Sequence, residues 1–454
     1  MADPRTLRTH PELRSMHSFP MFKTLGEKPK NALEKLLSLF ADVRAGEGGT
    51  VLLMITNVFL LLGAYYLLKV VRDTIILSDY SAKVKAYSSS GQALALLIAV
   101  PIYGWVGTKV NRIKLVTGLT AFFMSHLVIF AVLYSLHVQV DIVFYIWVGI
   151  FNFFVISQFW AFANDVFSEG QGRRLFPIIG VGASVGAFLG SGSATQFFKS
   201  NLAPSSSMFV ALVILSATIV LMILTNRREK TVADPATSKE AEEPLGDEGA
   251  FALILRDRYL FWIAVLTIIL NLVNTTGGYL MDRMIESRAA EIATADRGRF
   301  IGTFYGTTYT WVNGIGLLMQ AFGVSRIFRY AGVRGAMFFL PLLDLAGYAA
   351  LAVAPLLGIA RAVKIMENAT DYSIQNTVRQ AFFLPTSREA KYKAKAAVDT
   401  FCARFGDMGQ SAVVFIGDRL GLAVSGIAWI LVGFVIVWLW VAGQIATEHR
   451  RRTV

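Results

Sequence analysis

Apolar blocks long enough to cross a lipid bilayer recur along this chain, and they constrain its fold more than any other feature. The chain has 454 residues, of which 55% are hydrophobic and 16% are charged. A membrane-spanning helix needs about 20 mostly apolar residues, whereas soluble domains carry about 25% charged residues. The sequence therefore predicts an all-α membrane protein that crosses the bilayer many times.

The blocks predict twelve transmembrane helices in two groups of six. The first six cover residues 50–69, 88–106, 115–136, 140–162, 175–198 and 207–225. The second six cover residues 260–281, 300–322, 336–353, 357–374, 394–416 and 422–446. We expect each group to form one half of a major facilitator-like transporter, in which a substrate site lies between the halves.

The domain boundaries follow from these spans. We expect an N-terminal half over residues 50–225 and a C-terminal half over residues 258–446. The other segments are a basic cytoplasmic leader, a cytoplasmic linker and a basic cytoplasmic tail, over residues 1–49, 226–257 and 447–454. Apolar spacing over residues 31–43 predicts a surface helix in the leader. A faint repeat supports the two halves, since GWVGTKVNRIKLVTG resembles QAFGVSRIFRYAGVRG half a chain later.

Basic residues gather in alternate loops and at the C-terminus. They are Lys109, Arg112, Lys114, Arg173, Arg174, Arg227, Arg228, Lys230, Arg326, Arg329, Arg334, Lys391, Lys393, Lys395 and Arg450 to Arg452. The positive-inside rule places these loops and both termini in the cytoplasm. We therefore expect a multi-pass protein of the bacterial inner membrane. The same rule explains the net charge of +12 without a nucleic-acid partner.

Several other classes of protein are disfavoured. A single cysteine, Cys402, excludes an internal disulfide framework. Only His126 of the five histidines lies within an apolar block, so we expect no metal site and no other cofactor. The polar leader lacks the apolar core of a cleavable signal peptide. No histidine–carboxylate or serine–histidine set falls within the spans, so we do not expect an enzyme.

Gly182, Gly186 and Gly190 lie four residues apart in the fifth span. This spacing stacks them on one helix face, where a neighbouring helix can approach closely. We expect this seam to pack inside a single bundle, and the protein to be a monomer among membrane lipids.

Charged residues within spans are costly, so each is a candidate functional residue. Lys69, Arg72 and Asp73 share one face at the end of the first helix. One interpretation places them in the outer headgroup layer, with Lys69 snorkelling and Arg72 paired to Asp73. The other makes them the cationic lip of a cavity that receives an anion.

A second cluster lies in the tenth span and at its end. Lys364, Glu367 and Asp371 share a helix face, and Arg379 follows. A helix this polar cannot face lipid, which favours a cavity-lining role. Arg379 also fits a positive-inside anchor.

The remaining polar residues of the spans have simpler interpretations. Arg404 and Asp407 can neutralise each other within one helix. We expect Asn271 and Asn274 to hydrogen-bond between helices, and Asp282 to lie in the outer interface. Asp344 completes the set of intramembrane charges.

Aromatic residues suggest how a base could be held. Trp160 and Asn164 lie in the FWAFAN motif of the fourth span, and we include both among the candidate substrate-binding residues. A base can stack on aromatic rings while Arg and Lys hold phosphates. Single aromatic residues in membrane helices are more often packing or interfacial residues.

Several motifs resemble one known family. FWAFANDVFSEGQGRRLFPIIGVGASVGAFLGS is similar to the FWGFAN…AKRFYPLFGxGAN segment of the ATP/ADP translocases of plastids and obligate intracellular bacteria. YYLLKVVRDTIIL, ILNLVNTTGG and DYSIQNTVRQAFFLPTSREAKYKAKAAVDTFCARFGD extend the resemblance over most of the chain.

The resemblance also implies site residues. Basic positions of the family fall on Lys69 or Arg72, and on Arg379, where the family usually has lysine. Its acidic positions in the fourth and seventh helices fall on Val148 and Asn274. Both carboxylates are thus absent at these positions, which implies a more cationic cavity and a changed substrate preference.

The resulting hypothesis is a secondary transporter that works by alternating access. It would exchange nucleotides or related phosphorylated anions, so a small anion is the expected partner. Two alternatives stay open. One is a proton-coupled drug exporter or lipid flippase, in which Asp344, Glu367 and Asp371 carry protons. The other is a non-transporting membrane subunit or sensor.

Overall fold

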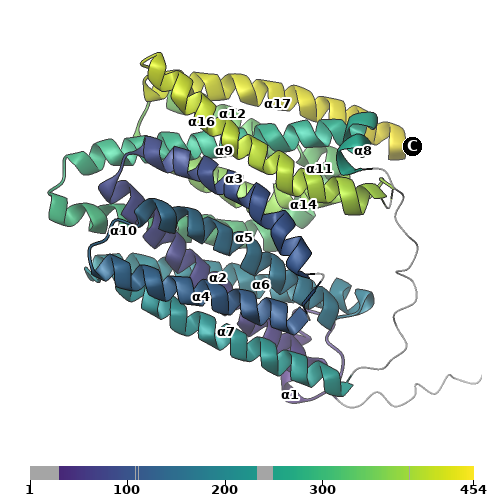
Figure 1. Cartoon of the computed structure of the whole chain (residues 1–454). Coiled ribbons are helices and arrows are strands. Elements are labelled where there is room, and N and C mark those ends of the chain that lie inside the picture. Colours follow the sequence, from purple (N-terminus) through teal and green to yellow (C-terminus); the bar gives the residue numbers. More distant parts are fainter. Residues whose placement is uncertain (1–29, 108, 111, 233–248, 388, 454) are drawn as a thin grey trace, which may run out of the picture. The chain divides into compact units, whose positions relative to one another are not determined.

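A computed structural model describes residues 30–107, 109–110, 112–232, 249–387 and 389–453 (Figure 1). It divides into two compact units. The first unit ends at Gly49, and the second begins at Thr50. Residues 1–29 of the expected leader and residues 233–248 of the expected linker lie outside the described residues.

The described part of the first unit contains one short helix, α1 (Ala32–Leu37). Asn31 caps it, because its side chain accepts from the Glu34 backbone N–H, while the Glu34 carboxylate accepts from the Asn31 N–H. The helix ends at Leu37, so the surface helix expected over residues 31–43 is shorter than predicted.

The second unit is built from long helices, and none of its described residues lies in a strand. Its earlier helices are α2 (Gly48–Asp79), α3 (Ala82–Gly107), α4 (Arg112–Ser135), α5 (Asp141–Val166), α6 (Glu169–Lys199) and α7 (Pro204–Val232). Its later helices are α8 (Ala250–Arg256), α9 (Arg258–Ala290), α10 (Thr294–Leu318), α11 (Val324–Ala336), α12 (Phe339–Val353), α13 (Leu357–Thr370), α14 (Asn376–Phe382), α15 (Lys395–Ala397), α16 (Ala403–Arg419) and α17 (Val424–Thr453).

Short π-helical segments continue several of the later helices. They are η1 (Met319–Gly323), η2 (Asp371–Gln375), η3 (Ala390–Ala394) and η4 (Val398–Cys402). The backbone at Asp371 and at Asn376 is α-helical, so α13, η2 and α14 form one helical run. Such π-segments often occur at functional sites.

The helices confirm an all-α membrane protein. Among the described residues, eight helices are long and apolar enough to span a membrane, and the bent pair formed by residues 294–336 and 339–353 would add a ninth. The helices α13 and α16 are shorter than 18 residues and carry charged side chains. The number of twelve spans therefore stays a prediction.

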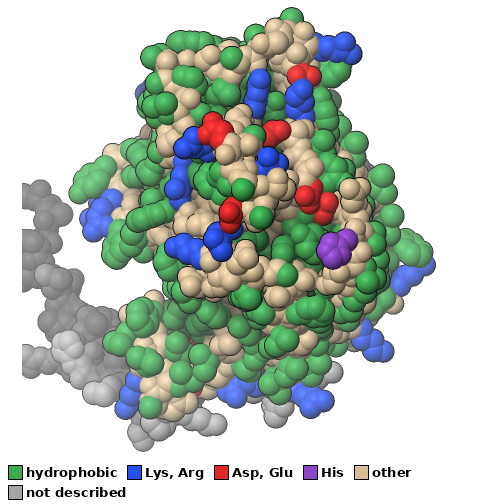
Figure 2. Space-filling view, turned by 90° about the vertical axis from the view of Figure 1, so that its left-hand side faces the viewer, with side chains coloured by type: hydrophobic (Ala, Val, Ile, Leu, Met, Phe, Trp, Pro, Cys, Tyr) green, Lys and Arg blue, Asp and Glu red, His purple; other side chains and the backbone are tan. Residues whose placement is uncertain are grey.

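Helices far apart in sequence pack together within the second unit. α6 lies against α10, and α3 lies against α16 and α9 (Figure 1). The end of the bundle at which α9 passes into α10 carries charged side chains of both signs (Figure 2). Lys83 and Asp418 form a partly exposed ion pair there, with nitrogen and oxygen 2.5 Å apart.

The glycine seam of α6 packs within the chain, as predicted. A Cβ atom at Gly182, Gly186 or Gly190 would meet the backbone of Ile55, Phe59 or Gly63 on α2. The two helices approach so closely that only glycine fits at these positions.

This contact predicts that Gly186→Val destabilises the protein. The added side chain must force α2 and α6 apart, at a cost of about 2–3 kcal/mol. Thermal unfolding of the detergent-purified protein measures the effect as a lower melting temperature. Gly180→Val is the matched control on the same helix, because a Cβ there meets no atom within 4 Å. Equal losses in both variants would contradict the seam.

Candidate functional site

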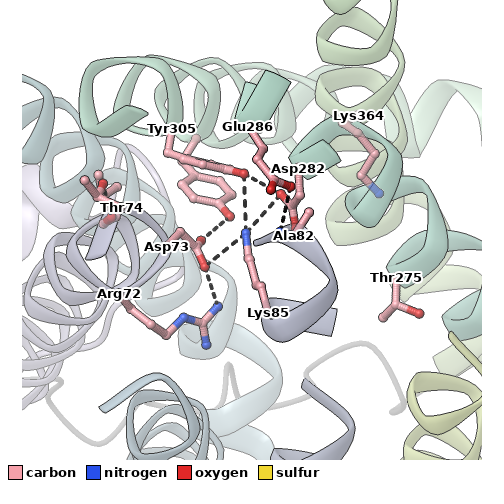
Figure 3. A network of polar contacts seen from close by, with 12 residues as sticks. Arg72, Asp73, Thr74, Ala82, Lys85, Thr275, Asp282, Glu286, Tyr305 and Lys364 are labelled. Atoms are coloured by element: carbon pink, nitrogen blue, oxygen red, sulfur yellow. Dashed lines mark hydrogen bonds and ion pairs between the residues drawn. The ribbon is translucent and has the colours of Figure 1, made fainter. Parts of the chain in front are cut away.

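A buried lysine, Lys85, joins four helices. Its Nζ lies 3.0 Å from Asp282 Oδ1 on α9 and 3.5 Å from Asp73 Oδ1 on α2 (Figure 3). The Tyr305 hydroxyl on α10 lies 3.4 Å from the same Nζ and also donates a hydrogen bond to Asp282. We call Asp73, Lys85, Asp282 and Tyr305 the Lys85 network.

Asp73 extends the Lys85 network along α2 and α10. Its carboxylate lies 3.3 Å from the Arg72 guanidinium, and it accepts a 2.7 Å hydrogen bond from the Tyr309 hydroxyl. Arg72 and Asp73 are buried, and Tyr309 is partly buried. A buried charge is tolerated only when it is paired and hydrogen-bonded, so these contacts hold the four helices in register.

The structure bears on two sequence-based interpretations here. Asp282, expected in the outer interface, is 6% exposed and bound to Lys85, so its side chain faces protein and not lipid headgroups. Of the two interpretations for the end of the first helix, the expected pair of Arg72 and Asp73 is present, and both side chains are buried among neighbouring helices. The sequence also missed Lys85, which precedes the expected second span. The signal that could have found Lys85 is that the second helix begins at Ala82, before its apolar core, and so includes Lys85.

Lys69 occupies a cage of tyrosine rings beside this network. Its Nζ lies 4.2 Å from the ring centre of Tyr309 and 5.2 Å from that of Tyr66. Its side chain is 9% exposed, and no carboxylate of the described residues lies within ion-pair distance. Cation–π contacts stabilise an ammonium partly, so Lys69 keeps the capacity to bind an anion.

Arg72 is held in a similar way. Its guanidinium lies 4.3 Å from the centre of the Tyr145 ring on α5, and its Nε has no hydrogen-bond partner among the described residues. The two basic residues predicted at the end of the first helix therefore lie together, buried and only partly neutralised.

A second network lies between α9, α12 and α13. Lys364 Nζ lies 2.8 Å from Glu367 Oε2 and donates a 2.8 Å hydrogen bond to the Asn274 carbonyl. The Tyr348 hydroxyl donates to Glu367 at 2.7 Å. The Asn274 side chain bonds Asn368 at 3.0 Å, which confirms it as an interhelical hydrogen-bonder. Lys364 is also close enough to Lys69 for their charges to interact.

The helical run formed by α13, η2 and α14 contains a further ion pair, which is longer than that of Lys364 and Glu367. Arg379 lies 3.6 Å from Asp371, the first residue of η2. Asp371 is 8% exposed, whereas Arg379 is half-buried. The structure thus brings Arg379 to the second cluster by pairing it with Asp371.

The other predicted residues are placed differently. Trp160 packs against Phe159 and Phe176, and Asn164 is exposed. No contact described for either residue reaches the Lys85 network or the Lys364 network. Val148 stands at the acidic position of the fourth helix that the resemblance implies, where it supplies no carboxylate and is fully buried on α5.

Two expectations about pairing had different outcomes. Asn271 bonds the Thr267 carbonyl of its own helix, so its expected interhelical bond is wrong. Arg404 and Asp407 pair within α16 at 2.7 Å, as predicted. Among the described residues, no group of three potential ligands could hold a metal ion.

Removing the cation of the Lys85 network should be strongly destabilising. Lys85→Met leaves Asp282 buried with no cation, at a cost of about 3–5 kcal/mol. Adding Asp282→Asn removes the orphaned charge and should restore most of the melting temperature. Lys83→Met is the control, because Lys83 is 44% exposed and pairs at the surface. A double variant no more stable than Lys85→Met would argue against the network.

Sequence comparisons agree with these observations. A model of the TLC ATP/ADP transporter family matches residues 136–343 and 327–449. ADP,ATP carrier protein 1 of Chlamydia pneumoniae is 23% identical over 331 residues, which are 62% of this chain and 62% of the relative. The same carrier of Chlamydia trachomatis is 24% identical, over 65% of this chain and 63% of the relative. The match thus spans less than two thirds of either chlamydial relative.

A more distant relative aligns over nearly its whole length. ADP,ATP carrier protein 5 of Rickettsia bellii is 21% identical over 95% of this chain and 100% of the relative.

Solved structures show that the fold is major facilitator-like. The nucleoside transporter NupG has a TM-score of 0.62 at 11% identity, covering 87% of this chain and 98% of that chain. A POT family transporter has a TM-score of 0.64 at 12% identity, covering 89% and 96%. The family model matches well over half of the residues of this chain. The fold is that of the solved transporters, and Lys69 and Arg72 are buried in it. The chain therefore belongs to the TLC ATP/ADP transporter family.

Proposed function

We propose that this protein is a secondary transporter that exchanges nucleotides of the ATP/ADP type, or related phosphorylated anions, by alternating access. The bacterial inner membrane would be its location, with both termini in the cytoplasm. Family membership and the names of the relatives support this class of substrate. The single observation that carries the proposal is Lys69, a buried cation with aromatic rings around it and no carboxylate of the described residues within ion-pair distance.

The charge balance around Lys69 favours an anion. Four buried cations lie here, Lys69, Arg72, Lys85 and Lys364, and the carboxylates that pair with them among the described residues are three, Asp73, Asp282 and Glu367. The other buried carboxylates of the later helices do not offset this difference, because Asp371 pairs with Arg379, Asp407 pairs with Arg404, and Asp344 bonds no cation. An ionised phosphate would supply the missing negative charge and form charge-assisted hydrogen bonds with Lys69 and Arg72. In this arrangement Asp73 positions Arg72 rather than binding the anion.

The tyrosines beside Lys69 fit the rest of a nucleotide. Tyr66 and Tyr309 meet edge to face with ring centres 6.2 Å apart, and Tyr305 stacks on Tyr309. A base can stack on such rings while its phosphates reach Lys69. Asn274, Lys364 and Glu367 would line the site from the later helices, and Asp371 and Arg379 would lie at its edge.

The Lys85 network fits alternating access. It joins α2 and α3 to α9 and α10, which belong to the two proposed halves. A site between the halves can open at this end only after these contacts break. Binding energy from an anion at Lys69 and Arg72 would have to compensate for their loss.

The acidic positions that the family resemblance implies are occupied here by Val148 and Asn274, so we ask whether another carboxylate, Asp282, replaces them. Asn274 stands at the expected seventh-helix position, but α9 carries Asp282 two turns further on. That carboxylate is bound to Lys85 and is therefore neutralised. The site would stay more cationic than the family pattern implies, which favours a substrate with several negative charges.

Nucleotide binding should depend on Lys69. ATP or ADP should raise the melting temperature of the purified protein in proportion to the logarithm of its concentration, because it binds only the folded state. Lys69→Gln removes a charged hydrogen bond and should weaken the apparent affinity roughly tenfold or more. Lys83→Gln, at the partly exposed pair, should leave the shift unchanged.

Exchange should then be measurable in proteoliposomes. Labelled nucleotide outside should enter only when unlabelled nucleotide is inside, and at low nucleotide concentration Lys69→Gln should slow this counterflow by the factor by which it weakens binding. If neither ATP nor ADP shifts the melting temperature, but a drug or a lipid does, the exporter or flippase alternative replaces the proposal. Absence of any stabilising ligand, with full tolerance of Lys69→Gln, would favour a sensor.

A further inference from the structure

Asp344 is a buried carboxyl group that the proposed exchange does not use. It lies on α12, it is 0% exposed, and it is the only charged residue between Phe339 and Val353. Neither of its oxygens has a hydrogen-bond partner among the described residues. Most buried polar groups in proteins are paired, so this exception requires an explanation.

The surroundings of Asp344 follow from the pairing of α12 with α13. The two helices are joined by the short segment 354–356, and a Cβ at Gly347 would lie 2.9 Å from Val363. One residue on, Tyr348 donates to Glu367. Asp344 lies one turn before Tyr348 on the same face of α12, so it faces the region of Glu367.

The charged groups that face Asp344 can be named element by element. α13 presents Lys364 and Glu367, and η2 presents Asp371. α17 also packs against α12, but it has no charged residue from Val424 to Thr447. α9 approaches α12 where Gly277 meets Tyr348, and it has no charged residue from Tyr259 to Met281. Lys364 is already bonded to Glu367 and to the Asn274 carbonyl. No described cation is therefore bonded to Asp344.

An ionised carboxylate in this position would be very unfavourable. Transfer of an isolated charge into a water-free interior costs far more than a protein's stability, and the group binds a proton instead. A neutral carboxyl costs much less, and its O–H can donate to a neighbouring carboxylate when one becomes available.

We propose that Asp344 is a proton-binding site of this transporter and that it carries a proton in the conformation seen here. The second part of the proposal rests on the proposed function. When an anionic substrate draws Lys364 away, Glu367 loses its cation. The proton on Asp344 then supplies the replacement hydrogen bond to Glu367. Anion binding and proton binding would thus favour each other, which would couple transport to protons.

Infrared spectroscopy tests the proton site without any substrate. The purified protein should show the carbonyl stretch of a buried, protonated carboxyl group at neutral pH, and Asp344→Asn should remove it. Asp399→Asn is the matched control, because Asp399 is partly exposed and paired with Lys395 at 3.1 Å. Asp344→Glu keeps the carboxyl group and should shift the band, which provides a second readout if the asparagine variant folds poorly.

Two results would overturn the assignment. The wild-type protein could lack the band at neutral pH, which would mean that Asp344 is ionised. Alternatively, the band could survive in Asp344→Asn and vanish in Glu367→Gln, which would place the proton on Glu367.

The coupling is tested by nucleotide binding above the pH at which the infrared band of the ligand-free protein begins to disappear, because below that pH the free and bound proteins both carry the proton. In this range, if one proton is linked, the apparent affinity for ATP should fall by up to about tenfold per pH unit as the pH rises. Asp344→Asn should bind with little dependence on pH. Nucleotide binding that is independent of pH in the wild type would reject the coupling and leave the proposed function intact. An infrared band at Asp344 without nucleotide binding would support the proton site and reject the proposed substrate.

Discussion

The structure depends on how charge is compensated where water is scarce. Lys85 shares two carboxylates and a tyrosine hydroxyl, and each partner comes from a different helix. If one partner were lost, a charge would stay buried in a low-dielectric interior without compensation. This costs far more free energy than the loss of a surface ion pair. This requirement fixes the relative positions of α2, α3, α9 and α10 more strictly than apolar packing can.

The same rule explains why the site is left partly unbalanced. Lys69 has tyrosine faces instead of a carboxylate, and Arg72 keeps an unbonded Nε. Native proteins rarely leave such groups without partners unless a ligand provides them. Each charge of the Lys85 network has an oppositely charged partner. The proposed binding step therefore adds charge at Lys69 and Arg72, while the neighbouring ion pairs hold the helices together.

Asp344 extends this principle to the later helices. It cannot be ionised without a partner, and Lys364 is engaged by Glu367. A neutral carboxyl behind an ion pair is a reserve hydrogen-bond donor that becomes useful once the ion pair opens. The π-segment η2 begins four residues after Glu367, where the helix has a local irregularity that permits rearrangement. The proposed proton site and the proposed anion site would therefore respond to the same movement of Lys364.

The sequence by itself determined the all-helical membrane fold, the glycine seam and the two sets of charged residues that share a helix face, Lys69 with Arg72 and Asp73, and Lys364 with Glu367 and Asp371. These features depend on local composition and on helical spacing, which are properties of one segment at a time. The sequence could not show that Lys85 and Asp282 meet, or that Asn164 is exposed and Lys69 is caged by tyrosines. Those facts depend on which helices are neighbours and on where each helix ends beyond its apolar core. Only the tertiary structure decides this, because a charged residue at the end of a span is equally compatible with lipid headgroups and with a buried partner on a distant helix.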